Sequence, residues 1–326
     1  MLESEILLLG IGSNKYKINE IFETDSLADI KKYYGEDSCF YDAYKTMIDF
    51  DHEKVYIANL ETWEDLQNIS SQLVDYNFDY ICPLDLYLDD EYYDDIRQKN
   101  LYHSQMLLFY LTRNISTVIM TGKYAGAYED LSSFLDDENL RIQKANAVFS
   151  TLRKENMVYV ANNLLGYRRA NVILACLLAN ADYAEYPGSN KLGSTIFDID
   201  FSDVKNQLVF FKNNHLTGTT VENLVNFSDD NKKKLVTINK IMKYFHYHSP
   251  EQHEQFIGKT FTEYRRMKIE ESLDDFLKNL VNWIIYKYQI ISVTAMTSKD
   301  GTAEVYLKYD IWPKYSTERY RLEMTA

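Results

Sequence analysis

Short apolar runs alternate with amphipathic segments along the first half of the chain. The run EILLLG at 5–10 is apolar up to its closing Gly10, which is typical of a buried strand. The segment INEIFET at 18–24 alternates between apolar and polar residues and predicts a partly exposed strand. Similar runs predict strands at 54–60, 78–84, 116–121 and 157–162.

Helix start and stop signals fill the intervals between these runs. Ser26 predicts an N-cap, and Gly35 predicts the end of the helix that begins there. Thr62 and Asp65 have the spacing of a capping box and precede an amphipathic segment. Further helices are predicted at 39–49, 90–112, 129–136 and 167–180.

Strands that alternate with helices of this length predict a parallel sheet covered by helices on both faces. We therefore expect an α/β core domain with a mostly parallel sheet over residues 1–214.

The pattern changes after Asp200. Helical segments are predicted at 202–214 and 238–288, and the β-like segments 289–297, 303–312 and 317–325 follow. The sequence SKDG at 298–301 predicts a hairpin turn between the first two of these segments. Residues 215–326 are therefore expected to form a smaller α+β domain that ends in β-strands.

Composition narrows the range of partners. With 326 residues, 46% of them hydrophobic, the chain can bury a sizeable core, and its 28 Tyr suit surfaces that pair with other proteins. The formal net charge of −14 repels polyanions. The basic clusters at 232–234 and 265–266 lack the glycine-aromatic pattern of an RNA-binding sheet. We expect no nucleic-acid partner.

The cysteines and the N-terminus indicate where the chain is made. Cys39, Cys82 and Cys176 are widely spaced, which predicts no disulfide framework and fits a reducing compartment. The N-terminal sequence MLESEILLL is acidic where a signal peptide is basic, and no apolar run reaches the roughly 18 residues of a membrane span. We expect synthesis and folding in the cytoplasm, without direct membrane contact.

The G-x-G of Gly10 and Gly12 raises the question of a dinucleotide site. Such a site needs a helix that starts directly after the glycine turn, but here Lys15, Tyr16 and Lys17 and a strand-like segment follow. The alternative is a strand-end turn that uses the tolerance of glycine for positive φ.

Other candidate chemistry is equally incomplete. His246, His248 and His253 cluster in HYHSPEQH, but Pro250 and Glu251 suggest a helix start there, so we expect surface histidines that flank a turn. The acidic runs lack EF-hand spacing, and no G-x-S-x-G elbow occurs. We expect no catalytic residue, no metal site and no cofactor.

The N-terminal stretch from 6 to 60 resembles the contractile phage tail sheath family. It has an apolar strand that ends in Gly10, a helix that ends at Tyr34 and Gly35, an alanine-bearing helix, and a further strand.

The stretch RRANVILACLLANADYAEYPGSNKLGSTIFDID at 168–200 and the C-terminal stretch at 262–325 also resemble this family. In the stretch at 168–200, a helix of small residues precedes a turn. The residues that match the family pattern at this turn are Asp182, Tyr186, Pro187 and Asn190.

The resemblance implies a structural subunit, not an enzyme. Such subunits polymerise around an inner tube in phage tails, R-type bacteriocins and related contractile injection systems, and contract to drive the tube through the target envelope. Expected partners are copies of the chain, the tail tube protein, and baseplate and tail-terminator proteins, in a virion tail assembled in the bacterial cytoplasm.

The family joins its subunits by adding strands of neighbours to a C-terminal sheet, and residues 303–325 are expected to offer two alternating strands with unpaired edges for this. The residues expected at this contact are Val305, Leu307, Tyr309, Ile311, Tyr320 and Leu322. Arg265, Arg266 and Lys268 are the tube-facing candidates, and a solvated helix face is the alternative interpretation.

Two other functions stay open. Sheath subunits usually carry an N-terminal arm, whereas only Met1–Ser4 precede the first strand here, so the chain could instead be a sheath-like cap, terminator or baseplate component at one end of the tail. A nucleotide-binding enzyme that uses the Gly10–Gly12 turn is an alternative of a different class.

Overall fold

The chain divides into two units with separate cores. The computed structural model describes residues 4–76, 78–86, 116–121, 156–160, 164–165, 168–180, 209–214, 218–222, 236–297, 303–314 and 320–325. The first unit contains residues 1–181 and 186–236, and the second contains 182–185 and 237–326. The predicted helices at 90–112 and 129–136, the turn at 298–301, and Asp182, Tyr186, Pro187 and Asn190 lie outside the described residues.

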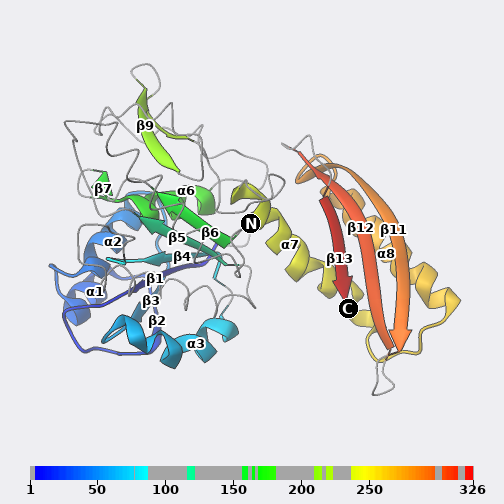
Figure 1. Ribbon diagram of the computed structural model, residues 1–326, viewed down its shortest axis with the longest axis horizontal. Coiled ribbons are helices and arrows are strands. Elements are labelled where there is room, and N and C mark those ends of the chain that lie inside the picture. Colours follow the sequence, from blue (N-terminus) through cyan, green and yellow to red (C-terminus); the bar gives the residue numbers. More distant parts are fainter. Residues whose placement is uncertain are drawn as a thin grey trace, which may run out of the picture. The chain divides into compact units, whose positions relative to one another are not determined.

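A six-stranded sheet is the centre of the first unit, as the apolar runs predict (Figure 1). The strand order is β2-β3-β1-β4-β5-β6, and every neighbouring pair is parallel except β2 with β3. The α/β architecture with a mostly parallel sheet is therefore confirmed. The strands are β1 (Ile6–Gly10), β2 (Ile21–Thr24), β3 (Val55–Asn59), β4 (Tyr80–Pro83), β5 (Thr117–Thr121) and β6 (Met157–Val160).

Helices lie on both faces of this sheet. Figure 1 shows α3 on the face opposite to α1, α2 and α6. Ile6 and Leu8 of β1 belong to the core with α1, α2 and α6, while Leu7 and Leu9 alternate to the other face, and all four are fully buried. The helices are α1 (Leu27–Tyr34), α2 (Cys39–Ile48), α3 (Leu66–Asp75), which follows the 3-10 turn η1 (Trp63–Asp65), and α6 (Ala170–Asn180).

The predicted caps are present. The Ser26 hydroxyl accepts a hydrogen bond from the Asp29 amide at 3.2 Å, and Gly35 ends α1 with a φ of 88°. Thr62 and Asp65 form the expected capping box at the start of η1. Local sequence signals thus set the ends of these helices.

The start of α6 is tied to the end of β4 and to the end of α2. Arg169 forms an ion pair with Asp85 at 2.9 Å, and Arg168 forms one with Asp49 at 2.8 Å. The buried Asn171 amide donates to the Pro83 carbonyl at 2.9 Å. The two-stranded β7 (Leu164–Leu165) and β8 (Arg168–Arg169) lead into the helix.

The edges of the six-stranded sheet are partly covered. The Gln72 side chain accepts from the Ile21 amide of β2 at 3.1 Å and donates to the Asn19 carbonyl at 3.0 Å. At the opposite edge, Val209 forms a parallel bridge with Val160 of β6. Covered edges leave few free backbone groups for another chain.

A strand replaces the C-terminal part of the helix predicted at 202–214. β9 (Phe210–Asn214) pairs antiparallel with β10 (Gly218–Glu222), because a partner segment satisfies the backbone of FFKNN across a short loop. Residues 202–208 lie outside the described part. Since β9 and β10 both belong to the first unit, the two units divide near Val236, downstream of the expected boundary at 214/215.

The second unit is a three-stranded antiparallel sheet with two helices. The elements are α7 (Val236–His253), the 3-10 turn η7 (Glu254–Phe256), α8 (Glu263–Leu280), β11 (Ile285–Thr297), β12 (Ala303–Pro313) and β13 (Tyr320–Thr325), and the strand order is β11-β12-β13. An α+β unit that ends in strands is confirmed.

The helix predicted to continue to 288 ends at Leu280. Asn282 adopts a φ of 73°, a left-handed conformation that asparagine tolerates better than most residues, and Ile285 already pairs with Pro313 of β12. The residues that follow, IYKYQIISV, are rich in β-branched and aromatic types, so β-pairing prevails over the helical pattern.

Candidate assembly interface

The C-terminal sheet covers its own core with the strand that was expected to face a neighbour. Leu307, Tyr309 and Ile311 are at most 1% exposed and belong to the core of the second unit. Val305 packs partly buried against the same core. The face that these residues share was predicted correctly, but the side chains stabilise the fold of the chain itself.

β12 has no free edge. It pairs with β11 from Ala303 to Pro313 and with β13 from Tyr306 to Ile311. The sequence interpretation of unpaired edges on both C-terminal strands is therefore wrong for β12, because β12 is the central strand.

The outer edge of β13 is free among the described residues. Tyr320 and Leu322 lie on β13, where their backbones pair with Ile311 and Tyr309 of β12. The register is unbroken over six residue pairs, and no described strand follows β13 in the sheet order. A regular strand with one unpaired edge can add a strand from another chain.

The outer edge of β11 is less regular. The register shifts between Ile285 and Lys287 and again between Ile290 and Ser292. Tyr286 and Ile291, the residues at these bulges, are 48% and 38% exposed. A cleft of about 390 Å³ between α8 and this strand is lined by Arg266, Met267, Glu270, Glu271, Asp274 and Ile290.

The basic residues expected to face a tube lie in the first turns of α8. Arg266 forms ion pairs with Glu263 at 2.8 Å and Glu270 at 2.7 Å, and Lys268 pairs with Glu271 at 2.6 Å. These carboxylates raise the pKa of both basic groups.

Arg265 differs, because its guanidinium donates to the Thr260 carbonyl and to no carboxylate among the described residues. The three candidates are thus neighbours on α8, but only Arg265 keeps an uncompensated charge there.

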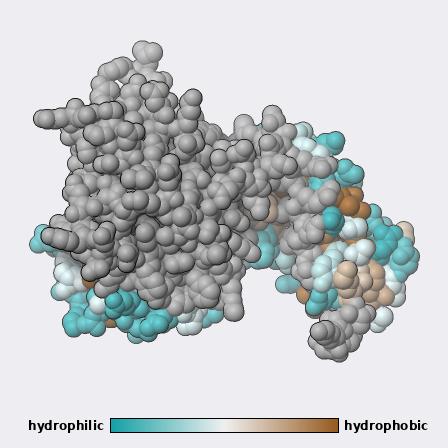
Figure 2. All heavy atoms as spheres, viewed as in Figure 1, coloured by the Kyte–Doolittle hydropathy of each residue, from teal (hydrophilic) through white to brown (hydrophobic). Residues whose placement is uncertain are grey.

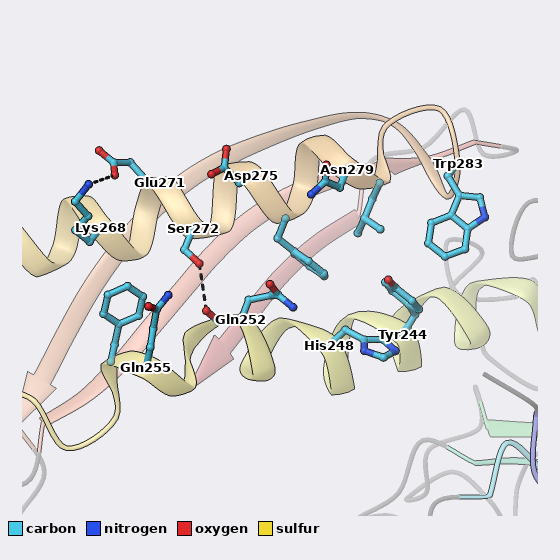
Figure 3. Close-up of a pocket in the computed structure, with 13 residues that line it drawn as sticks. Tyr244, His248, Gln252, Gln255, Lys268, Glu271, Ser272, Asp275, Asn279 and Trp283 are labelled. Carbon is cyan, nitrogen blue, oxygen red and sulfur yellow. Dashed lines mark hydrogen bonds and ion pairs between the residues drawn. The ribbon is translucent and has the colours of Figure 1, made fainter. Parts of the chain in front are cut away.

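A groove of about 610 Å³ runs between α7 and α8 (Figure 3). Tyr244 and Trp283 meet edge to face at one end, with ring centroids 5.6 Å apart. Near the middle, the Ser272 hydroxyl donates to the Gln252 carbonyl at 3.2 Å. The groove combines aromatic and amide side chains and contains no arrangement typical of an acid-base pair.

The histidine cluster lies on α7, which continues through Pro250 to His253. The expected helix start at Pro250 and Glu251 is therefore wrong. His246 is exposed, and the ring Nδ1 of His248 lies 3.0 Å from the Glu251 carboxylate. His253 is 3% exposed, so it is a core residue and not a surface histidine.

A partly polar buried stripe explains why the continuation of α7 through Pro250 and the burial of His253 escape prediction. Ile241, Phe245, Ser249 and His253 recur every four residues and form one buried stripe, half of it polar. Neither ring nitrogen of His253 has a hydrogen-bond partner among the described residues, and burial lowers its pKa to about 4.

The Gly10–Gly12 turn does not have the geometry of a dinucleotide site. The Gly12 amide donates to the Asn59 side-chain oxygen at 2.8 Å, and a Cβ on Gly10 would lie 3.2 Å from the Leu84 Cβ. Gly35 and Gly258 are the glycines with positive φ in the described part of the chain. Close packing, not positive φ, therefore requires the glycines at 10 and 12, which corrects the sequence interpretation.

Asn59 is a key residue that the sequence analysis missed. It is 1% exposed, and its amide nitrogen donates to the carbonyls of Asn14 and Tyr16 at 3.0 Å each. Its position at the end of a buried apolar run was the available signal, since a buried amide must find partners.

The described residues show no group of three or more His, Cys, Asp or Glu that could hold a metal ion. Within the same residues, no helix is long and apolar enough to cross a membrane. Burial raises the pKa of the Cys82 and Cys176 thiols, and it raises that of Cys39 to about 12. None of the three thiols is activated.

Comparisons with known proteins agree with this fold. No protein-family model matches the sequence, and no curated protein matches it. Among solved structures, a sheath tail protein from Desulfitobacterium hafniense is similar with a TM-score of 0.67 and 9% identity, over 99% of this chain and 96% of that one.

Two chains of the anti-feeding prophage are similar as well. A chain of its contracted helical sheath has a TM-score of 0.68 and 10% identity, over 99% of this chain and 93% of that one. A chain of its baseplate structure has a TM-score of 0.70 and 11% identity, with the same coverage. The chain has the fold of contractile tail-sheath proteins along nearly its whole length.

Proposed function

We propose that this chain is a structural subunit of a contractile tail sheath that polymerises around an inner tube and contracts to drive the tube through a target envelope. The observation that carries the proposal is the nearly full-length sheath fold together with the free outer edge of β13. The partners are copies of the chain, a tube protein, and baseplate and terminator proteins. The site of action is a tail assembled in a bacterial cytoplasm.

Strand addition at β13 gives the lattice a physical joint. An added strand of about five residues would form several backbone hydrogen bonds, each worth roughly 0.5–1.5 kcal/mol net. Such joints hold through hydrogen bonds along the strands, so they can persist while the first unit of each subunit changes its contacts. Contraction is then a switch between two packings of rigid bodies, with no chemical step.

Removal of residues 315–326 tests this joint. We expect assembly to be lost while the core stays folded, because Leu307, Tyr309 and Ile311 keep their contacts with β11, α7 and α8. Sedimentation measures assembly, and circular dichroism measures folding. Unchanged polymers after this truncation would refute the joint.

A pair of proline variants separates the free edge from the internal pairing. Successive residues of a strand direct their amides to opposite edges, so Arg321→Pro and Leu322→Pro remove amides from different edges of β13. We expect one variant to weaken the sheet and the other to fold normally but fail to assemble. Two variants with equal assembly would contradict the proposal.

A sheath-like component at one end of the tail is the second candidate. The similarity to a chain in the anti-feeding prophage baseplate structure favours it. Negative-stain images of tails with a labelled chain distinguish the two: a sheath subunit decorates the whole tail, and an end component decorates one end.

A nucleotide-dependent enzyme has little structural support, because Asn59 and Leu84 fill the space beside the Gly10–Gly12 turn. A thermal-shift experiment with NAD, ATP and S-adenosylmethionine tests it directly. A ligand at a hundred times its Kd would stabilise the fold by about 2.7 kcal/mol. We expect no shift.

A further inference from the structure

The connection between α7 and α8 forms a basic and apolar tip. We define the α7–α8 tip as residues 257–268, with the sequence IGKTFTEYRRMK. It contains the cations Lys259, Arg265, Arg266 and Lys268 against the single carboxylate of Glu263. The whole chain has 49 carboxylates and 35 cations, so this excess of positive charge is local.

Large apolar side chains of the tip are exposed to solvent. Ile257 is 71% exposed, Tyr264 is 69% exposed and Met267 is 51% exposed. Tyr264 and Met267 are three residues apart on α8 and therefore share a face. In Figure 2, brown hydrophobic residues lie among teal polar ones on the C-terminal unit. Tyrosine, methionine and arginine are the residue types that protein interfaces favour.

The backbone of the tip is held in place before any partner binds. Phe256, directly before the tip, and Phe261, within it, pack against the core of the second unit. Between them, Gly258 turns the chain with a φ of 73°. The Thr262 hydroxyl caps α8 by accepting from the Arg265 amide at 3.3 Å. A preorganised surface loses little conformational entropy on binding.

Two charges of the tip are left without a carboxylate. Arg266 and Lys268 pair with glutamates of α8, as described above. In the described part of the chain, Arg265 bonds the Thr260 carbonyl, and no carboxylate pairs with it or with Lys259. The free positive charge of the tip is therefore concentrated on Lys259 and Arg265.

We propose that the α7–α8 tip docks on an acidic surface of a second copy of this chain. Charge complementarity selects this occupant, because the copy has a net charge of −14 while the tip is positive. Ile257, Tyr264 and Met267 supply the apolar centre of the contact, and Lys259 and Arg265 supply its charged rim.

This contact rests on the proposed polymerisation and adds a second joint to it, separate from the strand addition at β13. The proposal places Arg265 at a contact between two copies of the chain, whereas the sequence analysis named it as a tube-facing candidate. Because the rim is charged, the contact weakens as salt screens it, whereas backbone strand pairing depends little on salt.

The experiment compares charge reversal at the tip with matched reversal elsewhere. The tip variant is Lys259→Glu with Arg265→Glu. The control variant, Lys15→Glu with Lys32→Glu, changes the net charge equally at exposed lysines of the first unit. Sedimentation velocity of the full chain over a concentration series, at low and high salt, measures self-association. Circular dichroism checks the fold.

For the tip variant we expect the concentration at half-assembly to rise by at least about tenfold at low salt, and for the control by less than about twofold. The variant Ile257→Ser with Tyr264→Ser, which keeps every charge, should weaken assembly at both salt concentrations. Equal effects of the tip reversal and the control reversal on self-association would overturn the proposal. It would also be overturned if the tip reversal, the control reversal and the serine variant all assembled like the wild type.

The outcome distinguishes this proposal from the proposed function. If the wild-type chain and the tip variants assemble alike but the truncation at 315 does not, the tip proposal fails and the sheath function stands. If the wild-type chain stays monomeric at every concentration, both fail.

Discussion

The two sheets of the molecule differ in how they treat their edges. The six-stranded sheet has Gln72 bonded to the edge strand β2 and Val209 bridged to the edge strand β6. The three-stranded sheet has a regular outer strand, β13, with no further described strand beside it. Both edges of the first sheet are partly covered, whereas the outer edge of β13 in the second sheet is suited to accept a strand from another chain.

The exposure of apolar side chains follows the same division. Seven of the ten large hydrophobic residues that are exposed in the described part of the chain belong to the second unit. The first unit buries β1 and β3 completely between helices. This division fits our proposal, in which the first unit is a self-contained body and the second unit is a connector between copies of the chain.

The largest expected effect comes from truncations in the two cores. Leu307→Ala should lower the free energy of unfolding of the second unit by about 2–5 kcal/mol, and Leu8→Ala should do the same for the first unit. Because the cores are separate, each variant should leave the other unit unchanged. Urea titration followed by hydrogen exchange measures both units. Equal losses in both units from one substitution would break the comparison.

Asn59→Ala tests how the first unit is held together. It removes three hydrogen bonds that hold residues 12–16 and leaves partly buried backbone groups without these partners, so we expect a loss of about 1–3 kcal/mol in the first unit. Urea unfolding measures the loss. The control Asn68→Ala alters an exposed amide that bonds Asp65 and should cost under about 0.5 kcal/mol. Similar losses for both variants would argue against Asn59 as a clamp.

His253→Leu gives the connector unit a pH signature. The folded pKa of His253 is about 4, below its usual 6.5, so the unfolded chain takes up the proton first as pH falls. Stability of the wild-type second unit should therefore drop by about 2–3 kcal/mol more than that of the variant between pH 6.5 and 4. Thermal unfolding at several pH values measures the difference. If the stability of the wild type and of the variant changed with pH in parallel, His253 would be exposed to water in the folded protein.

Arg266→Gln should have the smallest effect. The ion pairs of Arg266 with Glu263 and Glu270 lie on the surface of α8, so their loss should cost little stability, and less at high salt. Self-association should change far less than after charge reversal at Lys259 and Arg265. Sedimentation at two salt concentrations measures this change. An effect on self-association as large as that of the charge reversal at Lys259 and Arg265 would contradict the difference that we expect between paired and unpaired cations.

Elements with local signals were predictable from the sequence. The strand β1, the helix α1 between Ser26 and Gly35, and the capping box of Thr62 and Asp65 all follow from neighbouring residues. The inward face of β12 follows from its alternation. The failures at 210–214 and 285–288 occurred where pairing with another strand prevails over a helical pattern.

The candidate interface was only partly predictable. The sequence points to the C-terminal strands, but it does not show that β12 lies between β11 and β13, because strand order depends on long-range pairing. Likewise, the basic cluster of α8 is visible in the sequence, whereas its pairing with Glu263, Glu270 and Glu271 depends on the helix geometry.

By itself, the amino-acid sequence determined most of the alternation of strands and helices, the caps of α1 and η1, and the acidic character that disfavours nucleic acid, because these depend on local periodicity, capping and composition. Tertiary structure alone decided which strand edge stays free, why Gly10 and Gly12 are glycines, and that His253 is buried. Each of these depends on which segments distant in the chain come into contact, and that is settled by packing and by the pairing of backbone groups across the fold.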